Sequence, residues 1–167
     1  ITPGDGFYYT DAISDTAVKF IREHDSNDPF FMYVAYTAAH WPMHALPEDI
    51  AKYKGMYDIG WDAIRSARYR RMIEMGLISP TWEMSPAYPA DSEWEMADNK
   101  EWHARCMEVY AAMLDNMDQG IGRIVKELEA QGKLENTIIF YLQDNGACAE
   151  TYGFGNTYIP PQGEVEL

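Results

Sequence analysis

The strongest constraint on the fold is the run Thr-Ile-Ile-Phe-Tyr-Leu-Gln-Asp-Asn-Gly at residues 137–146. It opens with β-branched, aromatic and apolar residues and is bounded by turn-forming ones, a pattern typical of a strand buried on both faces. Strands of this kind occupy the centre of parallel sheets. The run therefore predicts an α/β fold with a mostly parallel sheet flanked by helices.

Polar side chains end this predicted strand. Asp144 offers carboxylate oxygens and Asn145 a carbonyl oxygen, which are hard donors suited to Ca²⁺ or Mg²⁺. Gly146 permits the turn that would let both side chains reach one ion. All three residues also favour turns on their own account, so a metal site and a simple turn both stay open on these residues alone.

A second apolar run, Phe-Phe-Met-Tyr-Val-Ala-Tyr at residues 30–36, predicts another buried strand, and His40 follows within a few residues. In open α/β sheets, ligands bind beyond the carboxyl ends of the strands. We therefore expect His40 and Asp144 to share a site. The alternative is that His40 is an ordinary loop residue beside a proline turn, with a backbone hydrogen bond.

Apolar residues at helical spacing predict helices around these strands. The helices are expected from Thr10 or Asp11 to about Glu23, briefly from Pro47, from about Asp58 to Met75, and from about Lys100 to Gln131. The buried face of the first is expected to comprise Ile13, Ala17, Phe20 and Ile21. The buried stripe of the last is expected to comprise Met107, Tyr110, Leu114, Met117, Ile121, Ile124 and Leu128, with Gly120 and Gly122 permitting close packing.

Residues 77–99 contain three prolines and several polar turn-formers, which predict an irregular, insertion-like surface loop. Trp82, Tyr88 and Trp94 are its candidate substrate-facing rings. The helix before this loop carries several arginines. They predict a solvated basic face rather than a phosphate or sulfate clamp.

Charge and cysteine content exclude several functions. The chain has 167 residues, enough for one domain, and a formal net charge of -14, which argues against nucleic acid and anionic membranes as partners. An anionic substrate stays compatible, because a bound cation can reverse the local field. Two cysteines are too few for a disulfide scaffold, and a membrane span would need about 18 consecutive apolar residues, which the sequence lacks.

Three blocks of the sequence resemble the type I sulfatases, the arylsulfatase family. They are Pro-Phe-Phe-Met-Tyr-Val-Ala-Tyr-Thr-Ala-Ala-His-Trp-Pro at residues 29–42, Met-Asp-Gln-Gly-Ile-Gly-Arg-Ile-Val at 117–125, and Asn-Thr-Ile-Ile-Phe-Tyr-Leu-Gln-Asp-Asn-Gly-Ala at 136–147. Their order is that of the family. The resemblance covers nearly the whole chain and is weakest over residues 77–99.

The resemblance implies an alkaline-phosphatase-like fold and hydrolysis of sulfate esters on aryl or carbohydrate substrates. It implies that Asp144 and Asn145 ligate Ca²⁺, or Mg²⁺, and that His40 is the catalytic histidine that contacts the sulfate and the leaving-group oxygen. His44 matches no such role and is expected to be a rim residue. The resemblance also implies a periplasmic or secreted location, or a lysosomal one in a eukaryote.

The nucleophile of the family is missing here. Family members use a formylglycine made within a Cys-x-Pro-x-Arg type motif, and neither Cys106 nor Cys148 lies in such a motif. Residues 1–167 are therefore expected to be the central portion of one sulfatase catalytic domain. The formylglycine and further metal ligands would lie in the remainder of the parent sulfatase chain, so this piece should be inactive alone.

Two other functions stay open. A phosphonate or phosphodiester hydrolase of the same superfamily shares the Asp-Asn metal pair, and the segment that would separate it from a sulfatase is absent. The third alternative is a non-catalytic module that binds carbohydrate or protein, in which Asp-Asn-Gly is only a turn.

Overall fold

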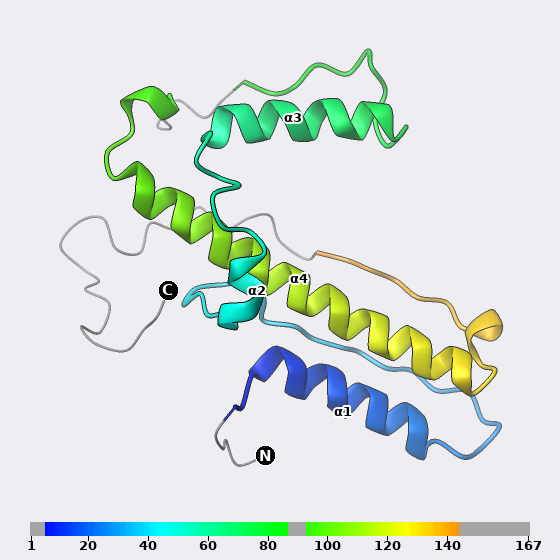
Figure 1. Cartoon of the computed structure of the whole chain (residues 1–167). Coiled ribbons are helices and arrows are strands. Elements are labelled where there is room, and N and C mark those ends of the chain that lie inside the picture. The colour runs from blue at the N-terminus through cyan, green and yellow to red at the C-terminus, as the bar shows by residue number, and fades with distance from the viewer. Residues whose placement is uncertain (1–5, 87–92, 144–167) are drawn as a thin grey trace.

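A computed structural model describes residues 6–86 and 93–143 (Figure 1). Its helices are α1 Tyr9–Glu23, α2 Pro47–Ala51, α3 Trp61–Glu74, η1 Trp94–Met96, α4 Lys100–Ala130 and η2 Leu134–Asn136, of which η1 and η2 are 3-10 turns. α1 and α4 run side by side in the same direction, and α2 lies against the middle of α4. α3 extends away from α1 and α4 (Figure 1), but its first residue contacts the start of α4, where the ring centroids of Trp61 and His103 lie 5.4 Å apart.

Small side chains bring α1 close to the C-terminal half of α4. A Cβ atom added at Gly120 would overlap the Ser14 side chain and lie 3.3 Å from the Tyr36 hydroxyl oxygen. The Ser14 Oγ is itself 2.8 Å from that hydroxyl oxygen. This contact therefore joins α1, α4 and the segment between them, as the expected close packing at Gly120 requires, whereas Gly122 has no described atom within 4 Å of its added Cβ.

Gly120→Ala is expected to lower the free energy of unfolding of the full-length protein by about 1–3 kcal/mol, because the new methyl group would force α1 and α4 apart. Gly122→Ala is the matched control. It should leave stability unchanged or raise it by up to about 1 kcal/mol, because alanine favours helix over glycine. Urea denaturation measures both changes, and equal effects at the two positions would contradict the packing described here.

An apolar cluster packs α2 against α4 and lies beneath the loop that contains His40. Its buried members are Met43, Ile50, Val109, Ala112 and Met113, and Ala38, Ala39 and Trp41 of the loop pack against it. The α4 stripe predicted from periodicity is thus partly wrong. Met117 and Leu128 are buried, but Met107 is 39% exposed, and the side chains that meet the loop come from a neighbouring face.

The four helices predicted from the sequence are present within a few residues of their expected limits. Of the residues expected on the buried face of α1, Ala17 and Ile21 are buried. Phe20 is an exception, because it is 58% exposed, and Thr10 and Ser14 are buried in its place.

The two predicted strands are extended segments, and no strand is assigned anywhere in residues 6–86 and 93–143. Both segments run back along α4 from its C-terminal end (Figure 1). Among the described residues, the backbone groups of residues 29–36 and 138–143 form no hydrogen bond to other backbone groups. A sheet requires such bonds between neighbours, so the parallel sheet stays a prediction.

The 77–99 segment is irregular where it is described, apart from η1. Trp82 is 62% exposed, whereas Trp94 is buried and its ring centroid lies 4.7 Å from that of Trp61. Tyr88 lies outside the described residues. No residue of α3 is buried, and Arg71 lies 3.8 Å from Glu74 with both side chains mostly exposed, as expected of a solvated basic face.

Candidate functional site

His40 lies a few residues beyond the end of the extended segment 30–36. The chain turns there, because the His40 backbone N–H donates to the Thr37 carbonyl oxygen at 2.9 Å. The flanking Ala39 and Trp41 pack on the α2–α4 cluster, while the His40 side chain is exposed. The loop is therefore anchored by its neighbours, and the imidazole is left accessible.

One nitrogen of this imidazole has a defined hydrogen-bond partner. The Nδ1 of His40 is 2.7 Å from the Trp41 carbonyl oxygen, which can only accept, so Nδ1 carries the proton. The second nitrogen, Nε2, is then the atom that can exchange a proton with a bound molecule. This hydrogen bond orients the imidazole ring.

A charged cluster holds α2, and with it the end of the His40 loop, on α4. Lys52 Nζ lies 2.7 Å from carboxylate oxygens of both Asp115 and Asp49, and these hydrogen bonds raise the pKa of Lys52. Asp49 is buried and also accepts a hydrogen bond from Asn116 Nδ2 at 3.2 Å. Lys52 is thus held as a cation, in a structural role.

The expected metal ligands Asp144 and Asn145 lie outside the described residues. In the described part of the chain, no group of three or more His, Cys, Asp or Glu side chains is arranged to hold a metal ion. His44, four residues beyond His40, is exposed, and its carbonyl oxygen accepts a hydrogen bond from the Tyr8 hydroxyl at 2.9 Å.

Cys106 does not have the environment of a nucleophile. Burial raises the pKa of its thiol to about 11. The thiolate is the reactive form, so the group stays protonated and unreactive near neutral pH. This agrees with the absence of a nucleophile motif around it, and Cys148 lies outside the described residues.

Sequence reasoning missed a cavity of about 1000 Å³ beside the first turns of α4. Its walls come from three separate segments, namely the loop after α2, η1 and α4 itself. Only the two tryptophans Trp94 and Trp102, eight positions apart, gave a signal that could have indicated it.

Comparison with known proteins identifies the family. The sulfatase family profile matches residues 1–165. The chain belongs to the sulfatase family. An uncharacterised sulfatase of Schizosaccharomyces pombe is 34% identical over 144 residues, covering 84% of this chain and 26% of the relative. An arylsulfatase of Klebsiella aerogenes is 34% identical over 145 residues, covering 86% of this chain and 31% of the relative.

Human N-acetylglucosamine-6-sulfatase is more distant, with 28% identity over 144 residues that cover 83% of this chain and 23% of the relative. The chain thus spans about a quarter to a third of the length of the curated sulfatases it matches first. Membership confirms the resemblance seen in the sequence and implies the alkaline-phosphatase-like fold of sulfatases, a family that generally uses a divalent metal.

Proposed function

We propose that the full-length protein is a sulfuric ester hydrolase and that this chain supplies its catalytic histidine and two of its metal ligands. The main support for this proposal is the match to the sulfatase family over residues 1–165. The geometry of His40 supports it, because an exposed imidazole with a fixed orientation follows directly on an extended segment. The formylglycine nucleophile belongs outside this chain.

The role proposed for His40 is proton transfer to the leaving group. As the S–O bond of the ester breaks, the bridging oxygen gains negative charge. With Nδ1 held by the Trp41 carbonyl oxygen, a protonated His40 donates from Nε2 to that oxygen. The product alcohol or phenol then leaves neutral, and His40 is left as a neutral imidazole.

The donor set proposed for the metal is Asp144 and Asn145, whose oxygens fit Ca²⁺ and also Mg²⁺. Ca²⁺ takes six to eight oxygen ligands, so this pair needs further oxygen ligands, which we assign to the remainder of the parent chain. A divalent ion at such a site supplies positive charge for the sulfuryl oxygens.

The exposure of the two extended segments supports the parallel sheet. Residues 31–36 alternate between exposed and half-buried, with Phe31 at 92% and Tyr33 at 81%. Residues 138–142 are all exposed, with higher and lower values in turn, at 80%, 51%, 77%, 59% and 81%. A period of two is that of a strand, and apolar side chains on the open face need a second layer. We therefore propose that both segments belong to a sheet covered by α4 on one side.

In this proposal residues 1–167 form the central portion of a single catalytic domain, with 77–99 as its surface loop. The substrate is a sulfate ester of an aryl or carbohydrate compound, as the names of the Klebsiella and human relatives suggest. The location is periplasmic or secreted, or lysosomal in a eukaryote. In residues 6–86 and 93–143, no helix has both the length and the apolar character to cross a membrane.

Matched esters test the reaction. The full-length protein is expected to hydrolyse 4-nitrophenyl sulfate with a kcat/KM at least about 100-fold above that for 4-nitrophenyl phosphate, because a site built for a monoanionic sulfate ester discriminates by charge. Absorbance of the released phenolate measures both rates. The reverse preference would indicate a phosphoester hydrolase, and no turnover of either ester would favour a non-catalytic module.

A further inference from the structure

The loop that contains His40, residues 37–44, is held at both ends by tyrosine hydroxyl groups. Tyr36 directly precedes the loop, and its hydroxyl oxygen lies 2.8 Å from a side-chain oxygen of α1. At the other end, the Tyr8 hydroxyl donates to the carbonyl oxygen of His44, the last residue of the loop, at 2.9 Å. One contact thus lies four residues before His40 and the other four residues after it.

A neighbouring hydrogen bond sets the direction of the Tyr36 contact. The hydroxyl of buried Ser14 donates to the Thr10 carbonyl oxygen at 3.0 Å, and a carbonyl oxygen can only accept. The Tyr36 hydroxyl must therefore be the donor to Ser14 Oγ. At the other end, burial raises the pKa of Tyr8, which keeps its hydroxyl protonated. Both tyrosines thus serve as hydrogen-bond donors.

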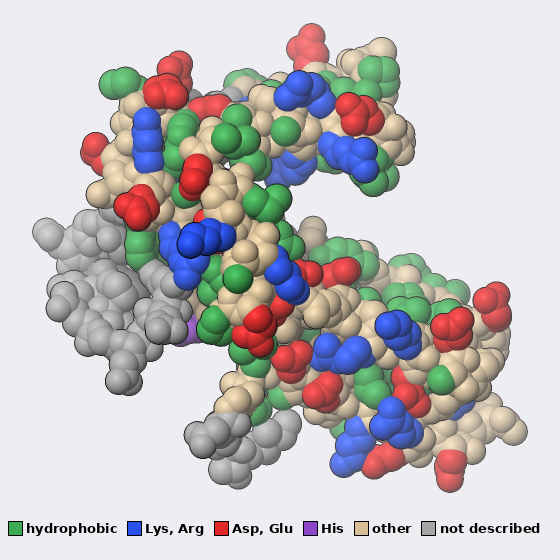
Figure 2. Space-filling model, viewed as in Figure 1, with side chains coloured by type: hydrophobic (Ala, Val, Ile, Leu, Met, Phe, Trp, Pro, Cys, Tyr) green, Lys and Arg blue, Asp and Glu red, His purple; other side chains and the backbone are tan. Residues whose placement is uncertain are grey.

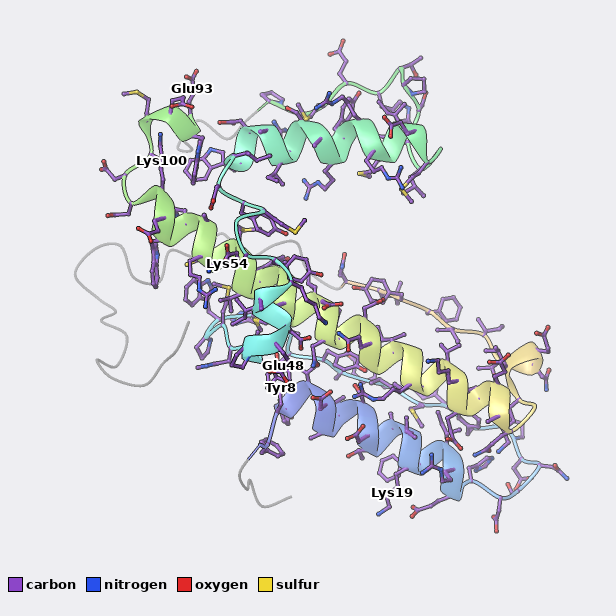
Figure 3. All side chains as sticks on the ribbon, in the orientation of Figure 1. Tyr8, Lys19, Glu48, Lys54, Glu93 and Lys100 are labelled. Atoms are coloured by element: carbon purple, nitrogen blue, oxygen red, sulfur yellow. The ribbon has the colours of Figure 1, made fainter. Side chains whose placement is uncertain are left out.

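Both contacts connect the loop to α1. Ser14 lies on the buried face of this helix, and Tyr8 lies directly before its first turn (Figure 3). α1 is in turn packed on α4, where Gly120 leaves room for the Ser14 side chain and Arg123 pairs with Asp11 at 2.8 Å. Acidic and basic side chains are interspersed on the outer surface of this helix pair (Figure 2). The loop is therefore tied to a helix that is itself held in place.

Apolar packing alone does not fix the position of the imidazole. Ala38, Ala39 and Trp41 pack on the cluster between α2 and α4, but such contacts are non-directional and permit sliding. A hydrogen bond has a preferred length and angle. The tyrosine hydroxyls thus supply the directional constraints at the loop ends, and the bond from His40 Nδ1 to the Trp41 carbonyl oxygen orients the ring between them.

We propose that Tyr8 and Tyr36 are positioning residues of the catalytic site, which hold His40 within reach of the oxygen that it protonates. The inference rests on the proposed function for the reaction of His40, whereas the contacts that hold the loop are independent of that reaction. A general acid must lie within hydrogen-bond reach of its target. A displacement of about 1 Å can lower turnover by about 100-fold, so constraints at the loop ends matter for the rate.

Tyr8→Phe in the full-length protein tests the proposal, because it keeps the ring and removes only the hydroxyl. It should lower kcat for a sugar sulfate by about 3–30-fold and leave KM within about twofold. Turnover of 4-nitrophenyl sulfate should fall by less than about threefold, because nitrophenolate leaves readily without a proton. Tyr36→Phe should behave alike. Tyr9→Phe is the matched control, because it removes the hydroxyl of the adjacent, exposed tyrosine, and it should change neither rate.

A double-mutant cycle separates positioning of His40 from a general structural effect. If Tyr8 acts through His40, then Tyr8→Phe should cause no further loss in a protein that already carries His40→Ala. If the tyrosine acts independently, its full loss should appear in that background as well. Additive losses would therefore overturn the proposal.

A second readout does not depend on turnover. NMR of the full-length protein with isotope-labelled histidine detects the imidazole signals, and His40→Gln assigns those of His40. These signals should shift or broaden in Tyr8→Phe, because a loop released at one end samples several positions, and they should stay unchanged in Tyr9→Phe. Unchanged His40 signals in Tyr8→Phe would overturn the positioning role. Altered signals in a protein that hydrolyses no sulfate ester would support that role and overturn the proposed reaction.

Discussion

Replacing His40 with alanine in the full-length protein is expected to lower kcat for sulfate-ester hydrolysis by about 10²–10⁴-fold, the usual contribution of a general acid. The loss should be larger for a sugar sulfate than for 4-nitrophenyl sulfate. A sugar alkoxide is a poor leaving group and needs the proton more than nitrophenolate does. Steady-state kinetics on both esters measures the effect, and KM should change less than kcat.

His44→Ala is the matched control for this experiment. His44 belongs to the same loop, is exposed, and uses only its carbonyl oxygen in the hydrogen bond from Tyr8. It should retain nearly full activity. Unchanged turnover by His40→Ala, or an equal loss with good and poor leaving groups, would show that His40 is not the proton donor.

Replacing Asp144 with alanine should weaken Ca²⁺ binding by the full-length protein and lower its activity, each by about 100-fold or more. Removal of a residue that merely orients a metal ligand costs about 10–100-fold, so removal of a ligand should cost at least that much. Calcium titration by calorimetry measures the affinity. Chelation followed by return of Ca²⁺ should abolish and restore the activity of the unmodified protein.

Asp118→Ala removes an exposed carboxylate from α4 and serves as the control, because it changes the net charge equally. It should leave both affinity and activity near their original values. If Asp144→Ala altered only thermal stability, then Asp-Asn-Gly at residues 144–146 would be a turn and the proposed metal site would be wrong.

Local sequence signals were sufficient for the helices. Proline at Pro47 and apolar spacing over residues 100–131 placed α2 and α4 within one or two residues. α3 starts at Trp61 rather than Asp58, because Gly60 adopts a φ of 84° and begins the helix there. Periodicity did not identify which of two adjoining faces of α4 meets the His40 loop, because that choice depends on the path of the loop.

The candidate site could be predicted only in part. The position of His40 followed from the end of an apolar run, which is a local signal. Its Nδ1 contact with the Trp41 carbonyl oxygen did not, because it depends on the turn. The cavity could not be predicted from the sequence, for a different reason. The loop after α2 meets α4 through the Gly55–Glu108 hydrogen bond between residues 53 positions apart, and no pattern in the sequence indicates that contact.

The open face of the two extended segments also bears on how the protein must be made. In both segments, backbone groups without backbone hydrogen bonds lie beside exposed apolar side chains such as Phe31, Ile138 and Phe140. This combination promotes intermolecular β-aggregation. In the proposed fold a second layer covers this face, and a nascent chain exposes it until that layer has formed. Chaperone binding to residues 30–36 and 137–142 would protect it in that interval, and production of residues 1–167 alone would favour inclusion bodies over soluble protein.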